Sequence, residues 1–198
     1  RKVVTEGRLG LSLGLDCLGA RVCSMDCVYC ESGATTALTD ERREYVPVRE
    51  VIAELDSLLS GSPELDFITF SGAGEPTLHS GIGKIIRHIK GRYPSYKICL
   101  LTNGSLLGDD AVIEDLRPLD LIVPSLDASD EETFRRINRP VPGLSQKKLL
   151  DAIVKFRRSC AVPMRLEIFV VPGLNDTPGS VAAFREAVSL IKPDSIDL

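Results

Sequence analysis

The sequence has no long apolar run, although hydrophobic residues fill 43% of its 198 positions. No run approaches the roughly 18 residues of a membrane-spanning helix, so we expect no transmembrane segment and no membrane partner. Tryptophan is absent, aromatic residues reach only 5%, and the formal net charge is −4. The overall composition therefore argues against a dedicated surface for nucleic acid or anionic lipid, although a local basic patch is compatible with it.

The sequence also lacks a disulfide framework and an N-terminal targeting segment. Its six cysteines lie at positions 17, 23, 27, 30, 99 and 160. One local cluster with three scattered single cysteines is typical of metal or redox chemistry in a reducing compartment, so we expect a cytoplasmic protein. Because the chain begins at Arg1 and stops in an apolar stretch, we expect one domain, residues 1–198, truncated at both termini.

Short apolar runs alternate with amphipathic segments along almost the whole chain. The expected strands are 9–15, 67–70, 98–101, 121–124, 165–171 and one that starts near 195. The expected helices are 48–59, 82–89, 109–117, 130–137, 145–158 and 179–191. This alternation predicts an α/β fold in which helices cover a parallel sheet. We expect a partial (βα)6 TIM-like barrel with parallel strands, and a flat doubly wound sheet is the alternative that periodicity does not separate from it.

Three serines stand where helices are expected to begin. Ser129 precedes Glu132 by three residues, which is a capping-box pattern, and Ser80 and Ser145 occupy similar positions.

The distinctive motifs each follow an expected strand, and the carboxyl ends of parallel strands form one ligand-binding rim. The motifs are the cysteine cluster 23–30, the glycine-rich loop 71–76, the Thr-Asn-Gly turn 102–104, the polar pair 125–127 and the turn 172–175. We therefore expect these segments to converge.

The cysteine cluster consists of Cys23, Cys27 and Cys30, at spacings of four and three. Soft thiolates favour iron–sulfur clusters, zinc or copper(I), and three local ligands leave one position of a four-iron cube open. Cys17, His79 or His88 is the alternative fourth ligand, and would close the site as structural zinc or as an electron-transfer cluster. Small buried cysteines are common in cores, and this is the interpretation we favour for positions 17, 99 and 160.

The combined motifs resemble the radical S-adenosylmethionine (radical SAM) superfamily. The resemblance rests on Cys-x3-Cys-x2-Cys with an aromatic residue before the last cysteine, followed by the loop SGAGEP at 71–76. The flanking sequences are similar to those of the subgroup of wyosine-synthase-like Fe–S oxidoreductases: LGLSLGLD at 9–16 and FITFSGAGEPTLHSGIG at 67–83. Position 73 departs from the usual pattern, because this chain has alanine where the family has a second glycine.

The resemblance implies that Cys23, Cys27 and Cys30 hold a [4Fe–4S] cluster whose open iron chelates S-adenosylmethionine. Reductive cleavage would give a 5′-deoxyadenosyl radical that abstracts hydrogen from the substrate. A reductant such as flavodoxin or ferredoxin is then required. The implied substrate is a small molecule or a tRNA base modified as in wyosine synthesis, although wyosine-forming enzymes carry further upstream cysteines and this chain has only Cys17 there.

The resemblance also assigns two groups of cofactor contacts. Tyr29 would lie along the adenine, with packing of its ring on the core as the alternative. The loop residues Gly72, Ala73, Gly74 and Glu75 would receive the methionyl ammonium, and an ordinary glycine-rich turn is the alternative.

A second set of contacts would come from later strand ends. Ser125 and Asp127 would meet the ribose, although Asp127 also suits a turn ahead of a helix. Asn103 would likewise either contact the cofactor or serve only as a turn residue. Val171 and Asn175 would border the adenine.

Two features have less specific interpretations. The basic stretch 134–140 is typical of a solvated helix face, and a phosphate contact to a nucleotide or tRNA is the alternative. His79 is interpreted as a satisfied loop histidine rather than a catalytic one. Apart from the enzyme hypothesis, we keep a non-enzymatic iron–sulfur or zinc protein with Cys17 as its fourth ligand.

Overall fold

A computed structural model describes the backbone of residues 2–7 and 9–198 and the side chains from residue 9 onward. Its strands are β1 (Lys2–Gly7), β2 (Gly10–Leu15), β3 (Val22–Cys23), β4 (Ala37–Leu38), β5 (Phe67–Phe70), β6 (Lys97–Thr102), β7 (Leu121–Pro124), β8 (Arg165–Glu167) and β9 (Ser195–Asp197). Its helices are α1 (Val48–Leu59), the short 3-10 helix η1 (Pro76–Leu78), α2 (Ile82–Arg92), α3 (Asp110–Leu116), α4 (Glu131–Ile137), α5 (Gln146–Ser159) and α6 (Pro178–Ile191). In this part of the chain no helix is long and apolar enough to cross a membrane.

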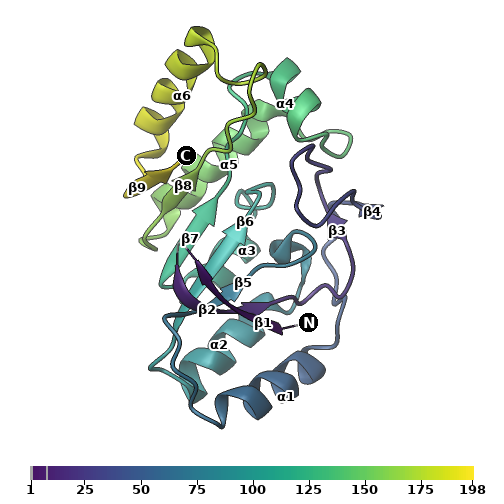
Figure 1. Cartoon of the computed structure of the whole chain (residues 1–198), viewed down its shortest axis with the longest axis vertical. Coiled ribbons are helices and arrows are strands. Elements are labelled where there is room, and N and C mark those ends of the chain that lie inside the picture. Colours follow the sequence, from purple (N-terminus) through teal and green to yellow (C-terminus); the bar gives the residue numbers. More distant parts are fainter. Residues whose placement is uncertain (1, 8) are drawn as a thin grey trace.

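The main sheet has the order β1-β2-β5-β6-β7. Strands β2, β5, β6 and β7 are parallel neighbours in chain order, and the connections between them carry α1, α2 and α3. This is the repeated βα crossover that the sequence predicts, and Figure 1 shows the helices around the strands.

Strands β8 and β9 extend the same parallel series. They pair with each other, and bridges from Ile122 to Met164 and from Ser125 to Glu167 join β8 to β7. Residues of the first parallel strand, β2, and of the last, β9, line one shared cavity. The series therefore curves round on itself, so the expected partial barrel of six parallel strands is confirmed and the flat doubly wound sheet is not.

Besides the short elements β3, β4 and η1, which were not predicted, two strands differ from the sequence prediction. Strand β1, which we did not expect, pairs antiparallel with β2 from Lys2 opposite Leu15 to Gly7 opposite Gly10. Strand β8 ends at Glu167, whereas the prediction continued it to 171. After Glu167, single hydrogen bonds such as Ile168 N to Asp197 O do not continue the strand ladder. Apolar composition alone does not show where a strand loses its partner.

Two of the three expected helix starts are wrong. Ser145 caps α5 as predicted, with its hydroxyl accepting from Lys148 N at 3.2 Å. At α4 the cap is Asp130, whose carboxylate accepts from Thr133 N at 2.8 Å, and Ser129 lies one position too early. At α2 the N-cap is Gly81, which has no side chain to cap with, so Ser80 plays no such part.

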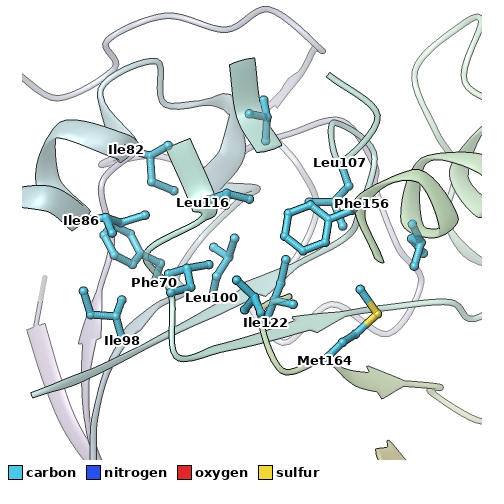
Figure 2. Packing of buried hydrophobic residues seen from close by; sticks show 14 of the residues in the cluster. Phe70, Ile82, Ile86, Ile98, Leu100, Leu107, Leu116, Ile122, Phe156 and Met164 are labelled. Atoms are coloured by element: carbon cyan, nitrogen blue, oxygen red, sulfur yellow. The ribbon is translucent and has the colours of Figure 1, made fainter. Parts of the chain in front are cut away.

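The main core lies between the strands and the helices. Alternate strand residues face the helices and are fully buried, among them Ile68, Phe70, Ile98, Leu100 and Ile122. Figure 2 shows several of them in one cluster with residues of α2 and α5, including Ile82, Ile86 and Phe156. Because side chains alternate along a strand, the intervening residues face the interior of the barrel.

Candidate metal and cofactor site

The cysteine segment leaves the barrel after β2 and is fastened to the end of α4. Asp26 N donates to Asn138 O and Val28 N donates to Ile137 O, both at 2.9 Å. Val141 N donates in return to Ser24 O at 2.9 Å. In Figure 1 this segment, with β3 and β4, lies beside the loop that follows α4. The cysteines therefore sit at the carboxyl ends of the strands, as predicted.

Two of the three clustered sulfurs accept a side-chain amide N–H. Asn103 Nδ2 donates to Cys23 Sγ and Asn138 Nδ2 donates to Cys27 Sγ, both at 3.4 Å, while Cys30 is exposed. Burial raises the pKa of Cys23 to about 12 and that of Cys27 to about 11. Binding of a metal centre would therefore displace protons from these two thiols, and the amide donors would stabilise the thiolates that result.

The donor set fits an iron–sulfur cluster. In the part of the chain that the structure describes, no three Cys, His, Asp or Glu side chains gather closely enough to hold one metal ion. In a four-iron cluster each cysteine binds a different iron, so the sulfurs need not meet at one point. Three accessible or half-buried thiols with N–H donors on two of them suit such a centre.

The glycine-rich loop owes its shape to close packing against the cysteine segment. A Cβ atom on Gly74 would lie 1.9 Å from the carbonyl oxygen of Val22, which accepts from Glu75 N at 3.0 Å. Gly72 has φ +138°, and a Cβ atom there would lie 2.7 Å from Asp16. Side chains are therefore excluded at both positions, whereas Ala73 is tolerated.

Glu75 is buried, and its carboxylate accepts four hydrogen bonds within the protein. Oε1 accepts from Thr77 N and from the hydroxyls of Thr77 and Thr102, and Oε2 accepts from Asn103 N at 2.6 Å. Burial raises the pKa of this carboxyl, while the hydrogen bonds lower it. Glu75 therefore joins the glycine-rich loop to the end of β6 and fixes the backbone of Asn103 beside Cys23.

Asp127 joins three segments at the other side of the cysteine loop. Its carboxylate accepts from the Tyr29 hydroxyl, from Asn138 Nδ2 at 3.0 Å and from Phe169 N at 2.9 Å. Burial raises the pKa of Asp127, and these donors lower it. The ring of Tyr29 stacks on Phe169 with centroids 4.2 Å apart. Tyr29 and Asp127, which the sequence predicts at one site, thus lie in direct contact.

The remaining predicted residues lie along the same rim. Asn175 is buried, and its Nδ2 donates to the backbone oxygens of Asp127 and Phe169, both at 2.8 Å. Its Oδ1 accepts from Val171 N at 2.7 Å, so Val171 and Asn175 form one turn. The Ser125 hydroxyl lies 3.5 Å from Glu167 Oε2. All five predicted segments therefore converge at the carboxyl ends of the strands.

The residues proposed as a fourth ligand are engaged elsewhere. Cys17 is buried in the hydrophobic core, and burial raises its pKa to about 12. His79 accepts from Gly81 N through Nδ1 and contacts Val46 O through Nε2, which fits the predicted satisfied loop histidine. His88 pairs with Asp56 across α1 and α2. Cys99 and Cys160 are buried, as the sequence predicts.

The arginines of the basic stretch have acidic neighbours. Arg135 pairs with Glu131 at 2.6 Å, and Arg139 Nη1 lies 3.7 Å from Asp26. The geometry agrees with a solvated, charge-balanced helix face.

Asn138 is the site residue that sequence reasoning missed. It is buried, it contacts both Cys27 and Asp127, and its Oδ1 is buried without a hydrogen-bond partner among the described residues. The only sequence signal was its place at the end of α4, directly after a helix that follows the fourth parallel strand.

The family model "Radical SAM superfamily" matches residues 18–183. Over 98% of its length the chain is 36% identical to the GTPase Obg of Brachyspira hyodysenteriae, of which the match covers 28%. Over 98% it is 34% identical to a UPF0026 protein of Synechocystis sp., of which the match covers 72%. The chain thus spans only part of the length of these relatives.

Solved structures share the fold. The structure of anSMEcpe with bound AdoMet superposes with a TM-score of 0.68 over 93% of this chain and 50% of that one, at 19% identity. TYW1 with a lysine-pyruvate adduct gives a TM-score of 0.59 over 89% of this chain and 61% of that one, also at 19% identity. With the family match over most of its length, the chain belongs to the radical SAM superfamily of enzymes, whose cofactors are a [4Fe–4S] cluster and S-adenosylmethionine.

Proposed function

We propose that Cys23, Cys27 and Cys30 hold the cluster and that this chain cleaves S-adenosylmethionine reductively there. The observation that carries the proposal is the convergence of the cysteine loop, its two amide donors and the glycine-rich loop on one rim of the barrel. The bound cofactors supply a 5′-deoxyadenosyl radical for hydrogen abstraction, and the protein supplies position, shielding and electrostatics.

The residues of the glycine-rich loop would bind and position the methionyl part of the cofactor. The backbone of Gly72, Ala73 and Gly74 is free of bulky side chains and suits the methionyl ammonium and carboxylate. Glu75 acts through its buried hydrogen bonds, which hold this loop and Asn103 in place.

The later strand ends would hold the nucleoside part of the cofactor. Tyr29 would border the adenine, and Asp127, whose buried carboxylate accepts from the Tyr29 hydroxyl, holds it in place beside the ribose position. Ser125 lies at the same strand end. Val171 and Asn175 form the turn that borders this region.

The substrate that we propose is a tRNA base, in the manner of wyosine synthesis. Two observations support this substrate: the sequence similarity of residues 9–16 and 67–83 to the wyosine-synthase-like subgroup, and the fold shared with TYW1. Arg139, which follows α4, lies 3.7 Å from Asp26 of the cysteine loop. The arginines of α4 itself are paired only through exposed side chains, and phosphate groups displace such pairs easily. An external reductant, flavodoxin or ferredoxin, would supply the electron.

The test is anaerobic reconstitution with iron and sulfide, followed by electron paramagnetic resonance of the reduced protein with and without S-adenosylmethionine. We expect a cluster signal that changes on addition of the cofactor, and formation of 5′-deoxyadenosine. Cys30→Ser should lose the cluster signal, whereas Cys17→Ala should keep it because Cys17 belongs to the core. A cluster that ignores the cofactor, or that depends on Cys17, would contradict the proposal and support the closed four-cysteine site.

A further inference from the structure

The residues that line one side of the barrel interior are unusually small and polar. Parallel βα barrels generally fill this space with bulky branched side chains. Here β2 contributes Ser12 and Gly14, β5 contributes Thr69, and Ser71 follows directly after β5. The branched residues of the lining are Leu101 of β6, Val123 of β7 and Leu9, which precedes β2. The small residues leave a cavity of about 190 Å³.

Arg165 enters this cavity from the opposite strand, β8. Its guanidinium faces Asp197 of β9 with an Nη1–Oδ2 separation of 3.6 Å, longer than a hydrogen bond. Within the described part of the chain no hydrogen bond from Arg165 is found, and its side chain is only 30% exposed. Partial burial of a guanidinium is costly unless its N–H groups find acceptors, and a bound ligand would provide them.

Hydroxyl groups complete the wall opposite the arginine. Ser12 Oγ and Thr69 Oγ1 are 2.5 Å apart and share one hydrogen bond, so one of the two hydroxyl protons remains for a ligand. Ser71 lines the same cavity and is the first residue of the glycine-rich loop. The cavity therefore runs from the interior of the barrel toward the cofactor rim.

We infer that this cavity binds an oxyanionic group of the substrate, a carboxylate or a phosphate, with Arg165 as its cationic anchor. A planar guanidinium binds such groups through two parallel hydrogen bonds. The one hydroxyl proton left by the Ser12–Thr69 pair and the Ser71 hydroxyl suit the remaining oxygens. Asp197 balances the charge of Arg165 when the ligand is absent. The cavity is smaller than typical ligand pockets of roughly 300–1,000 Å³, so it takes the anionic end of a substrate rather than the whole molecule.

This inference rests on the proposed function, because the other end of the ligand would point to the radical at the rim. The test therefore has two separate readouts on one preparation of reconstituted protein saturated with S-adenosylmethionine. The first is the melting temperature in sodium phosphate or sodium acetate, compared with sodium chloride at matched ionic strength. The second is formation of 5′-deoxyadenosine without substrate.

We expect phosphate, acetate or both to raise the melting temperature of the wild type by about 2–4 °C, as an anion that binds only the folded protein does. Arg165→Gln should abolish this rise, and Arg165→Lys, which keeps the charge but loses the fork, should weaken it. The matched control is Arg158→Gln, an exposed arginine of α5 outside the cavity, which should keep the full rise. A rise with phosphate alone identifies a phosphate-bearing substrate, and a rise with acetate alone identifies a carboxylate.

The two readouts separate the two proposals. If neither anion raises the melting temperature, or if the rise persists in Arg165→Gln, the inference is overturned even when 5′-deoxyadenosine forms. If 5′-deoxyadenosine does not form but the rise depends on Arg165, the anion site stands and the proposed function fails.

Discussion

Asn103 and Asn138 donate side-chain N–H groups to the sulfurs of Cys23 and Cys27, at 3.4 Å in both cases. Both amides are held in place, since Asn103 Oδ1 accepts from Ser105 N and Asn138 Nδ2 also donates to Asp127. Hydrogen bonds to cluster ligands stabilise the reduced state, which carries the extra electron on iron and sulfur. In the site proposed above, the two asparagines would therefore favour reduction of the bound cluster.

Asn138→Leu should lower the midpoint potential of the reconstituted cluster. Loss of one neutral hydrogen bond is worth about 1 kcal/mol, which for one electron corresponds to about 40 mV. The measurement is a redox titration followed by electron paramagnetic resonance. Asn175→Leu is the control, because Asn175 is an equally buried amide that bonds only to backbone atoms. Equal potentials in the wild type and Asn138→Leu would show that the N–H···S contact has no electronic effect.

Gly74→Ala should separate the glycine-rich loop from the cysteine segment. The added Cβ atom would meet the carbonyl oxygen of Val22 at 1.9 Å, and backbone can only move away. We expect a loss of about 1–3 kcal/mol in the free energy of unfolding, together with less iron per chain after reconstitution. Urea denaturation and iron analysis measure the two effects.

The control for this substitution is Gly91→Ala. Gly91 lies near the end of α2, and an added Cβ atom there meets nothing within 4 Å. Alanine should stabilise this helix by about 0.5–1 kcal/mol and leave iron binding unchanged. The prediction for Gly74 fails if its alanine variant behaves like the Gly91 variant.

At the scale of elements, α4 matters because its far end carries Ile137 and Asn138, which hold the cysteine loop. The helix is short and depends on its cap, the Asp130 carboxylate that accepts from Thr133 N at 2.8 Å and from the Thr133 hydroxyl. Asp130→Ala should therefore cost about 1 kcal/mol, and Ser129→Ala should change stability by less than about 0.5 kcal/mol. Equal losses in urea denaturation would restore Ser129 as the cap.

The same cap gives a pH dependence. The hydrogen bonds from Thr133 hold the pKa of Asp130 below its usual value. A carboxyl whose pKa is lower in the folded state stabilises the fold above its unfolded pKa, about 3.9, and loses this contribution as the pH falls toward the folded pKa. The difference in stability between wild type and Asp130→Ala should accordingly shrink in denaturation curves recorded below about pH 4.

At the scale of the whole molecule, the cysteine loop connects regions far apart in the sequence. It is bonded to the end of α4 through Asp26 and Val28, and its continuation donates from Arg43 N to Leu78 O beside the glycine-rich loop. A cluster bound by residues 23–30 would therefore stabilise both halves of the rim at once, because it binds the folded chain only.

Removal of iron by a chelator should lower the melting temperature and raise amide hydrogen exchange most in residues 24–43 and in the loop after α4. Exchange in α2, whose inner face is fully buried in the core, should change least. The variant with Cys23, Cys27 and Cys30 all changed to serine should show no difference with and without chelator. If iron removal raised amide hydrogen exchange equally along the whole chain, the loop would not be specifically coupled to the rim.

The sequence by itself determined the alternation of the main strands and helices and the rim at which the motif residues meet. Strands β5 and β7 have the predicted bounds, since short apolar runs flanked by turn residues have little freedom to shift. The motifs meet at one rim because parallel strands present their carboxyl ends to the same side. These local signals predict that the three clustered cysteines, Gly74 and Asp127 lie at this rim.

Only the tertiary structure decided which partners these residues have. Strand β1 pairs antiparallel and β8 ends early, because pairing depends on neighbours distant in the chain. Asn138 contacts Cys27 across 111 positions, and Arg165 faces a cavity whose other wall belongs to β2 and β5. Periodicity reports the face on which a side chain lies, and it carries no information about what stands opposite once the barrel curves.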